Sequence, residues 1–85
     1  MFIYIGNDHV VESKYIISIL DVQLKQTSSK LQRIVQDFKM NEKLFGDEAD
    51  AKSLILTDDA LYYSPLSTMT LKKTKKLESK FMQDL

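Results

Sequence analysis

The chain has no cysteine, one histidine, one proline and two widely separated glycines. Without cysteine there are no disulfides and no thiolate metal sites, and the chain fits a reducing compartment without proving one. Gly6 and Gly46 lie too far apart for a glycine-rich phosphate loop, and the chain shows no convincing nucleophile–base pair. These absences argue against an enzyme, although they leave open an active site shared between subunits.

No apolar run in the chain is long enough to cross a membrane. The N-terminal run, residues 2–5, is too short for the core of a signal peptide and follows no basic leader. We therefore expect a cytoplasmic protein with no membrane partner and no small-molecule substrate. Its 85 residues should form one domain, 1–85, whose small core leaves a monomer marginally stable and favours self-association.

The charges balance, with 12 basic and 12 acidic residues, but they are unevenly placed. Residues 47–59 carry five acidic side chains against one lysine, and residues 72–80 carry five lysines against one glutamate. A balanced total gives no global field of either sign. The polarised layout suits either a head-to-tail assembly or a basic patch kept apart from an acidic edge.

The richest local pattern lies in the C-terminal half. Two short apolar runs, 53–56 and 60–63, are separated by turn-forming residues and predict a β-hairpin. Pro65 ends the second strand, because proline has no N–H to give to a neighbouring strand. A hydroxyl just after it can cap a new helix. We predict that helix over residues 68–84, with a lysine cluster in its first half.

The N-terminal half predicts three strands and one helix. A Gly-Asn-Asp turn joins the first two strands, and the third is almost continuously apolar, which predicts burial on both faces. The helix is amphipathic, and Gly46 is placed to end it. Strands are expected at residues 2–5, 9–11 and 15–20, a loop at 22–26 and the helix at 29–44. The order β-β-β-α-β-β-α predicts an α+β fold with a small, largely antiparallel sheet and two helices.

Few residues offer chemistry on their own. His9 is more simply a surface or satisfied side chain than a ligand, and the carboxylates at 47–50 lack the spacing of a calcium loop. We therefore expect no metal and no cofactor. The lysines at 72–76 fit a solvated helix face and a phosphate-binding patch equally well. Neither predicted helix shows the clustering of Arg, Asn and Gln that base readout prefers.

Tyr62 and Tyr63 are neighbours on a predicted strand, so their side chains should face opposite ways. One is expected in the core. The other either stacks on a base or fills a subunit interface, and the interface is favoured because tyrosine is common there. We assign Tyr62, Tyr63 and Leu66 to a predicted oligomer interface.

Two stretches, YYSPLSTMTLKK and YIGNDHVVESKYIISIL, resemble the RemB-type members of the Rem family. These are small bacterial regulators of extracellular-matrix (biofilm) genes. The resemblance covers nearly the whole chain, and its most specific part is the corner at residues 63–67, aromatic-Ser-Pro-Leu-Ser. It implies a fold similar to the LytTR DNA-binding domain. It also implies a ring-shaped homo-oligomer that wraps DNA with arginines presented by each subunit.

The chain departs from RemA-like members where they carry a glycine followed by paired arginines. Here Gly46 is followed by DEADA, and only Lys52, next to the strand, keeps a positive charge. A further family arginine aligns with Tyr15, with Lys14 beside it, whereas Arg33 matches the family's basic residue. If DNA is bound, most of the charge must come from Lys14, Arg33, Lys52, Lys72, Lys73, Lys75 and Lys76.

Two functions follow from these observations. The first is a non-enzymatic transcription regulator that binds DNA as a ring-like homo-oligomer, with each subunit adding a few lysine–phosphate contacts. The alternative is an oligomeric scaffold of the same fold that has lost or weakened DNA binding. The acidic residues 47–50 favour the alternative, because carboxylates repel phosphates.

Overall fold

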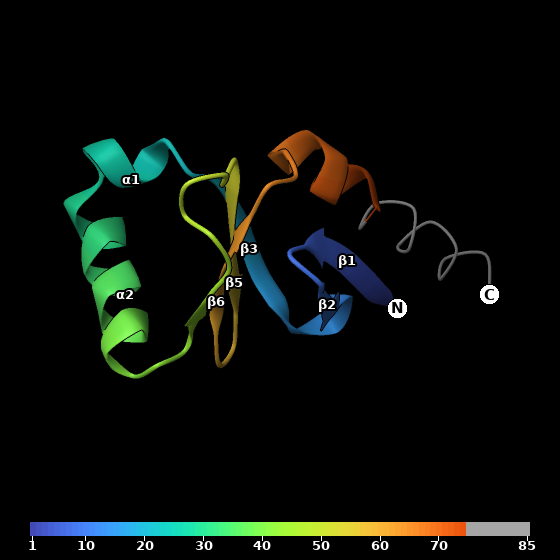
Figure 1. Cartoon of the computed structure of the whole chain (residues 1–85), viewed down its shortest axis with the longest axis horizontal. Helices are drawn as coiled ribbons and strands as arrows, with labels where there is room; N and C mark the ends of the chain where they lie inside the picture. The colour runs from blue at the N-terminus through green and yellow to red at the C-terminus, as the bar shows by residue number, and fades with distance from the viewer. Residues whose placement is uncertain (75–85) are drawn as a thin grey trace.

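The computed structural model describes residues 1–74 and has the predicted α+β fold (Figure 1). Its strands form two sheets rather than one: an antiparallel pair, β1–β2, and a four-stranded sheet in the order β3-β5-β6-β4. In the larger sheet β4 runs parallel to β6, and the other neighbours are antiparallel. The elements are β1 (Phe2–Gly6), β2 (His9–Glu12), the 3-10 turn η1 (Ser13–Tyr15), β3 (Ile16–Asp21), α1 (Leu24–Thr27), α2 (Ser29–Met40), β4 (Leu44–Phe45), β5 (Ser53–Thr57), β6 (Leu61–Ser64) and a helix at 68–74.

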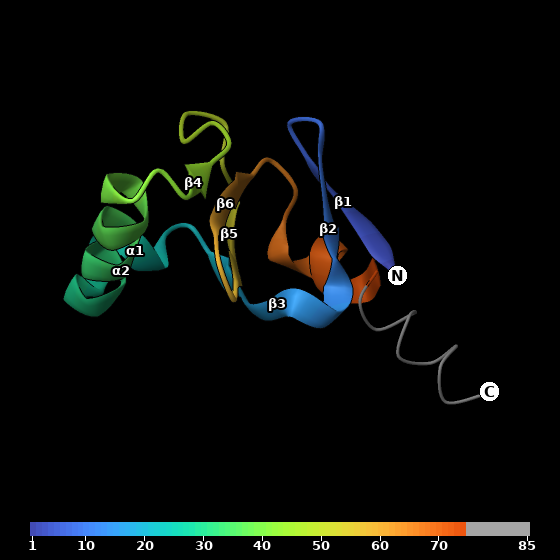
Figure 2. The same cartoon turned by 90° about the horizontal axis from the view of Figure 1, so that it is seen from below.

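The strands β5 and β6 separate two hydrophobic cores. Helices α1 and α2 lie on one side of the larger sheet, and the β1–β2 hairpin and helix 68–74 lie on the other (Figures 1 and 2). Leu54 and Tyr63 face α2, whereas Ile55 joins the core on the hairpin side with Leu71 of the last helix. This alternation follows from strand geometry, in which successive side chains point to opposite faces.

The β1–β2 hairpin forms as predicted. Asn7 and Asp8 have φ of 55° and 62°, the left-handed conformation that a two-residue hairpin loop favours. Gly6 beside them has φ of +90°, and a Cβ there would stand 2.5 Å from Pro65 Cδ. The corner after β6 therefore rests against the bend of the first hairpin, at a point where only glycine fits.

The third strand is not buried on both faces, so that prediction was wrong. Ile16 and Ile19 enter the hairpin-side core, but Ile17 is 63% exposed. The reason is topological, since β3 is an edge strand with an irregular register between Ile16 and Ser18. The loop expected at 22–26 is also wrong in part, because Leu24–Thr27 form the short helix α1.

Helix α2 ends at Met40, four residues earlier than the predicted boundary at 44. The N–H of Lys43 donates to the carbonyl of Phe38, and the N–H of Glu42 donates to that of Lys39. This is the bond pattern of a Schellman cap, with Glu42 at φ 57° in the place that glycine usually takes. Gly46, the predicted terminator, instead passes against β6, where a Cβ would lie 2.3 Å from the carbonyl oxygen of Tyr63.

Two buried serines tie the corner after β6 to the rest of the fold. Ser53 and Ser64 face each other across β5 and β6, and neither is exposed to solvent. The Ser64 hydroxyl donates to the carbonyl of Ile5 and accepts the N–H of Leu66 at 3.1 Å. The Ser53 hydroxyl donates to the carbonyl of Leu66 at 2.8 Å. These bonds fix the direction in which the chain leaves the sheet toward helix 68–74.

We expect Ser64→Ala to destabilise the protein by about 1–3 kcal/mol, because it leaves the buried carbonyl of Ile5 and the part-buried N–H of Leu66 without their partner. The measurement is chemical denaturation at neutral pH. Ser29→Ala, an equal change at an exposed position in α2, should alter stability by less than about 0.5 kcal/mol. Equal effects of the two substitutions would contradict the structural role given to Ser64.

Candidate nucleic-acid interface

Three shallow hollows adjoin along the edge where α1, the 46–52 loop and helix 68–74 lie (Figure 1). The first, of about 290 Å³, lies between Lys52 and the start of the helix at Ser67 and Thr68. The second, of about 450 Å³, is lined by Lys25, and the third, of about 440 Å³, extends to Lys39. Neighbouring hollows share lining residues, so we describe them together as the polar furrow, which runs from Thr68 past Lys52 and Lys25 to Lys39.

Glutamines accompany the lysines along the polar furrow. Gln32 and Gln36 lie four residues apart on α2, which places them on one helix face. An amide both donates and accepts hydrogen bonds, as contacts to base edges require. The full set in the furrow is Gln23, Gln26, Gln32 and Gln36. The structure thus gathers amides from two separate segments of the chain.

Lys25 lies at the centre of the polar furrow and holds two partners. Its Nζ donates to Tyr63 Oη at 2.8 Å and to Glu48 Oε1 at 3.0 Å. The same ammonium stands 5.4 Å from the centre of the Tyr63 ring. The bond to Tyr63, and after it the bond to Glu48, raises the pKa of Lys25 above its usual 10.5. We call Lys25, Glu48 and Tyr63 the clasp.

The structure brings only some of the predicted DNA-binding residues together. Lys52 is exposed and lines the polar furrow beside helix 68–74, on which Lys72 and Lys73 are also exposed. Arg33 is exposed on α2, and Lys14 lies in η1 with its ammonium 5.2 Å from the Tyr15 ring. The segments that carry these two residues lie apart, with α2 on one side of the larger sheet and η1 next to the β1–β2 hairpin (Figure 1). The predicted contacts Lys75 and Lys76 lie outside the described residues.

The residues predicted for an oligomer interface differ in exposure. Tyr63 is only 3% exposed and belongs to the core beside α2, so little of it is left for a neighbouring subunit. Tyr62 faces the other way, as strand alternation requires, and is half-buried. Leu66 is half-buried against the same core as Tyr62. Their part in an interface stays a prediction.

His9 packs in an aromatic cluster rather than at a site of its own. Its ring centre lies 5.4 Å from that of Tyr62 and 6.1 Å from that of Phe45, both edge-on. Its Nδ1 is buried without a hydrogen-bond partner among the described residues. Within residues 1–74, no group of three His, Asp or Glu side chains is placed to hold a metal ion.

An acidic hollow of about 340 Å³ lies on the other side of β6, away from the polar furrow. Glu12, Asp58 and Asp59 line it together with Tyr15 and Tyr62. Burial, and after it the charge of Asp59, raises the pKa of Tyr62 above its usual 10.0. Three carboxylates repel phosphate, so this hollow does not extend a nucleic-acid interface.

Comparison with known proteins assigns the chain to a family. The RemA-like family, described as extracellular matrix regulatory protein A-like, matches residues 2–74. The chain belongs to this family. It is 34% identical over 76 residues to extracellular matrix regulatory protein B of Bacillus subtilis, which covers 86% of this chain and 88% of that protein. The family suggested by the residues around the Ser-Pro-Leu-Ser corner is therefore confirmed. None of the helices described within residues 1–74 is long and apolar enough to cross a membrane.

Sequence reasoning missed the clasp. Lys25 falls in the segment predicted as a loop, and Glu48 was interpreted only as part of an acidic run. The hydroxyl of Tyr63 reaches Lys25 across 38 residues of sequence, and no local pattern signals such a contact. The spacing of Gln32 and Gln36 was a visible signal, because residues four apart share a helix face.

We expect Tyr63→Phe to lower the pKa of Lys25 toward 10.5, because the hydroxyl that stabilises the charged ammonium is removed. A raised pKa stabilises the fold at pH values below the ordinary pKa, and this stability disappears as the pH rises through the higher folded value. The wild type should therefore exceed the variant in stability at neutral pH, by a margin that shrinks above about pH 10.5. An NMR titration of the Lys25 side chain measures the pKa, and chemical denaturation at neutral pH and above about pH 10.5 measures the difference in stability.

Tyr15→Phe is the matched control, since it removes a hydroxyl from a tyrosine whose ring lies beside Lys14 rather than Lys25. It should leave the pKa of Lys25 unchanged. A Lys25 pKa that is the same in Tyr63→Phe and in the wild type would show that the clasp does not form in solution.

Proposed function

We propose that this protein is a cytoplasmic, non-enzymatic transcription regulator of extracellular-matrix genes that binds DNA as a ring-like homo-oligomer. Membership of the RemA-like family supports the regulatory role, as does the similarity to a protein named extracellular matrix regulatory protein B. The DNA contacts are lysine–phosphate pairs, which carry no sequence information of their own.

The observation that carries this proposal is the placement of Lys52 beside helix 68–74. Lys52 immediately precedes β5, yet it shares a hollow with Ser67 and Thr68 at the beginning of the helix. Thr68 and Lys72 are four residues apart and share a face of that helix. Two separate segments thus present cations and hydroxyls along one edge, and both groups donate hydrogen bonds to phosphate oxygens.

A ring explains how so few cations can suffice. The described part of one subunit offers Lys52, Lys72 and Lys73 at this edge, which alone give weak, salt-sensitive binding. A homo-oligomer repeats the same edge in each subunit, so later contacts form at high effective concentration. The net charge of zero excludes a global attraction to DNA and leaves the local edge as its source.

We expect Lys52→Ala, Lys72→Ala and Lys73→Ala each to weaken binding to duplex DNA and to flatten its salt dependence. Each lost phosphate contact should reduce the slope of log affinity against log salt by about 0.9. Fluorescence anisotropy of a labelled duplex at several salt concentrations measures both quantities, with the oligomer mass determined in the same buffers.

Lys43→Ala removes an equal charge from an exposed position just after α2 and serves as the control. It should leave the slope unchanged. If all four substitutions behave alike while the oligomer stays intact, the edge formed by Lys52 and helix 68–74 is not the DNA-binding surface.

A second candidate function is an oligomeric scaffold with lost or weakened DNA binding. Its support is the exposed acidic loop, in which Asp47, Glu48 and Asp50 stand next to the proposed phosphate contacts. In such a scaffold the acidic loop would pair with the basic helix of a neighbouring subunit. An oligomer that dissociates as salt rises, in a protein that does not bind DNA at low salt, would favour this function. An oligomer of constant mass at all salt concentrations would count against the pairing.

A further inference from the structure

The clasp at the centre of the polar furrow holds more hydrogen-bond donors than its carboxylate uses. Lys25 has three N–H groups, of which one goes to Glu48 and one to Tyr63. Tyr63 Oη accepts from Lys25, and because Tyr63 is only 3% exposed, its hydroxyl serves to orient the ammonium. The side chain of Tyr63 is fixed in the core, and the Lys25 side chain is only 27% exposed. The donors are therefore held in place before any ligand arrives.

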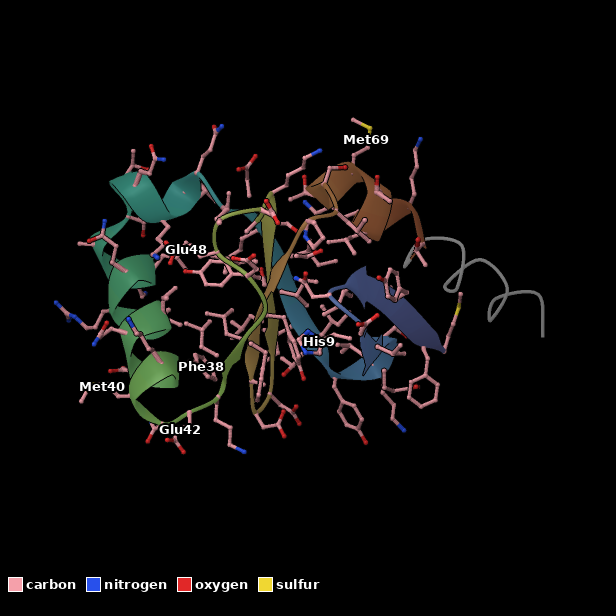
Figure 3. The ribbon with its side chains drawn as sticks, in the orientation of Figure 1. His9, Phe38, Met40, Glu42, Glu48 and Met69 are labelled. Carbon is pink, nitrogen blue, oxygen red and sulfur yellow. The ribbon has the colours of Figure 1, made fainter. Side chains whose placement is uncertain are left out.

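Glu48 stands where a phosphate oxygen would bind. An ionised carboxylate only accepts hydrogen bonds, and so does a phosphodiester oxygen, so both suit the same donors. The Glu48 side chain is 67% exposed, which makes its ion pair with Lys25 easy for solvent or another anion to replace. Figure 3 shows Glu48 near α1, between the helices and the larger sheet.

The loop that carries Glu48 is bonded mainly to itself around this residue. The N–H of Ala49 donates to the carboxylate of Asp47, and the N–H of Ala51 donates to the carbonyl of Glu48. The bond from Lys25 to Glu48 joins this loop to α1 through their side chains. Exchange of Glu48 for another anion therefore needs no change in either hydrophobic core.

We propose that Lys25, held in place by the hydroxyl of Tyr63, forms a phosphate-binding site for the backbone of DNA, and that Glu48 occupies this site in the free subunit. This inference rests on the proposed DNA-binding function and adds a contact to it. The site lies between Lys52 and Lys39 along the polar furrow, so a bound strand would meet cations at the centre and at both ends. Glu48 then acts as a competitor, and DNA has to displace it before the central contact forms.

The test is the affinity of Glu48→Gln for a labelled duplex, measured by anisotropy at several salt concentrations. We expect the affinity to rise about two- to fivefold for each Lys25–Glu48 ion pair that is removed, which is the range of an exposed ion pair. We also expect the salt slope to steepen by about 0.9 for each subunit that gains a phosphate contact. Circular dichroism and oligomer mass would confirm that the exposed substitution leaves the assembly intact.

Glu42→Gln is the matched control. It removes the same charge from an exposed carboxylate just after the C-terminal end of α2, far from α1, as the labels in Figure 3 show. It should raise the affinity for DNA only by the small amount expected from the loss of any one negative charge. Lys25→Met should weaken binding, and in that background Glu48→Gln should gain no more than Glu42→Gln does.

The outcomes separate this inference from the function on which it rests. If the wild type binds DNA but Glu48→Gln matches Glu42→Gln, or Lys25→Met binds as the wild type does, the phosphate site is refuted and the DNA function stands. If the wild type does not bind and Glu48→Gln does, the competitor role is supported directly. If neither binds at low salt, both the DNA function and the site are refuted.

Discussion

The burial of β5 and β6 on both faces is the constraint on which the rest of this small fold depends. Within each strand, alternate side chains enter different cores, so the two strands join α2 on one side to the β1–β2 hairpin and helix 68–74 on the other. A domain of this size has little apolar area to spare. In this domain both faces of one pair of strands contribute side chains to a hydrophobic core. Where the pair ends, Ser53 and Ser64 supply polar bonds that a buried corner needs.

This arrangement also sets the position of the polar furrow. The register that pairs Leu54 with Tyr63 places the Tyr63 ring in the core beside α2. From there its hydroxyl reaches Lys25 of α1. One residue before β5 begins, the backbone N–H of Lys52 donates to the carbonyl of Ser64, which fixes its place beside the corner. The cations of the polar furrow thus come from α1, from the residue before β5 and from α2. The central strands fix the positions of these three segments.

The sequence revealed the features that depend on neighbouring residues. The hairpins around Asn7 and Asp58 follow from apolar runs and turn residues, and the α+β class follows from their order. The family follows from the Ser-Pro-Leu-Ser corner. The early end of α2 could not be predicted, because Glu42 takes a backbone conformation that sequence patterns assign to glycine. The clasp could not be predicted either, since it joins Lys25, Glu48 and Tyr63 through tertiary packing alone.

The acidic loop would help assembly in the scaffold function and would weaken binding in the DNA-binding function. The geometry of Glu48 determines how large the second effect is. Carboxylates spread evenly over an interface would repel DNA at every approach, whereas Glu48 is paired with the cation that a phosphate would use. In the DNA-binding function its cost would therefore be a competition for Lys25 rather than an absolute barrier. This competition would cost a similar free energy in each subunit that engages the duplex. In a ring-like oligomer each later contact would form at high effective concentration, which would offset that cost. If the protein binds DNA as proposed, an acidic loop beside basic residues would favour DNA that is long enough to contact many subunits at once.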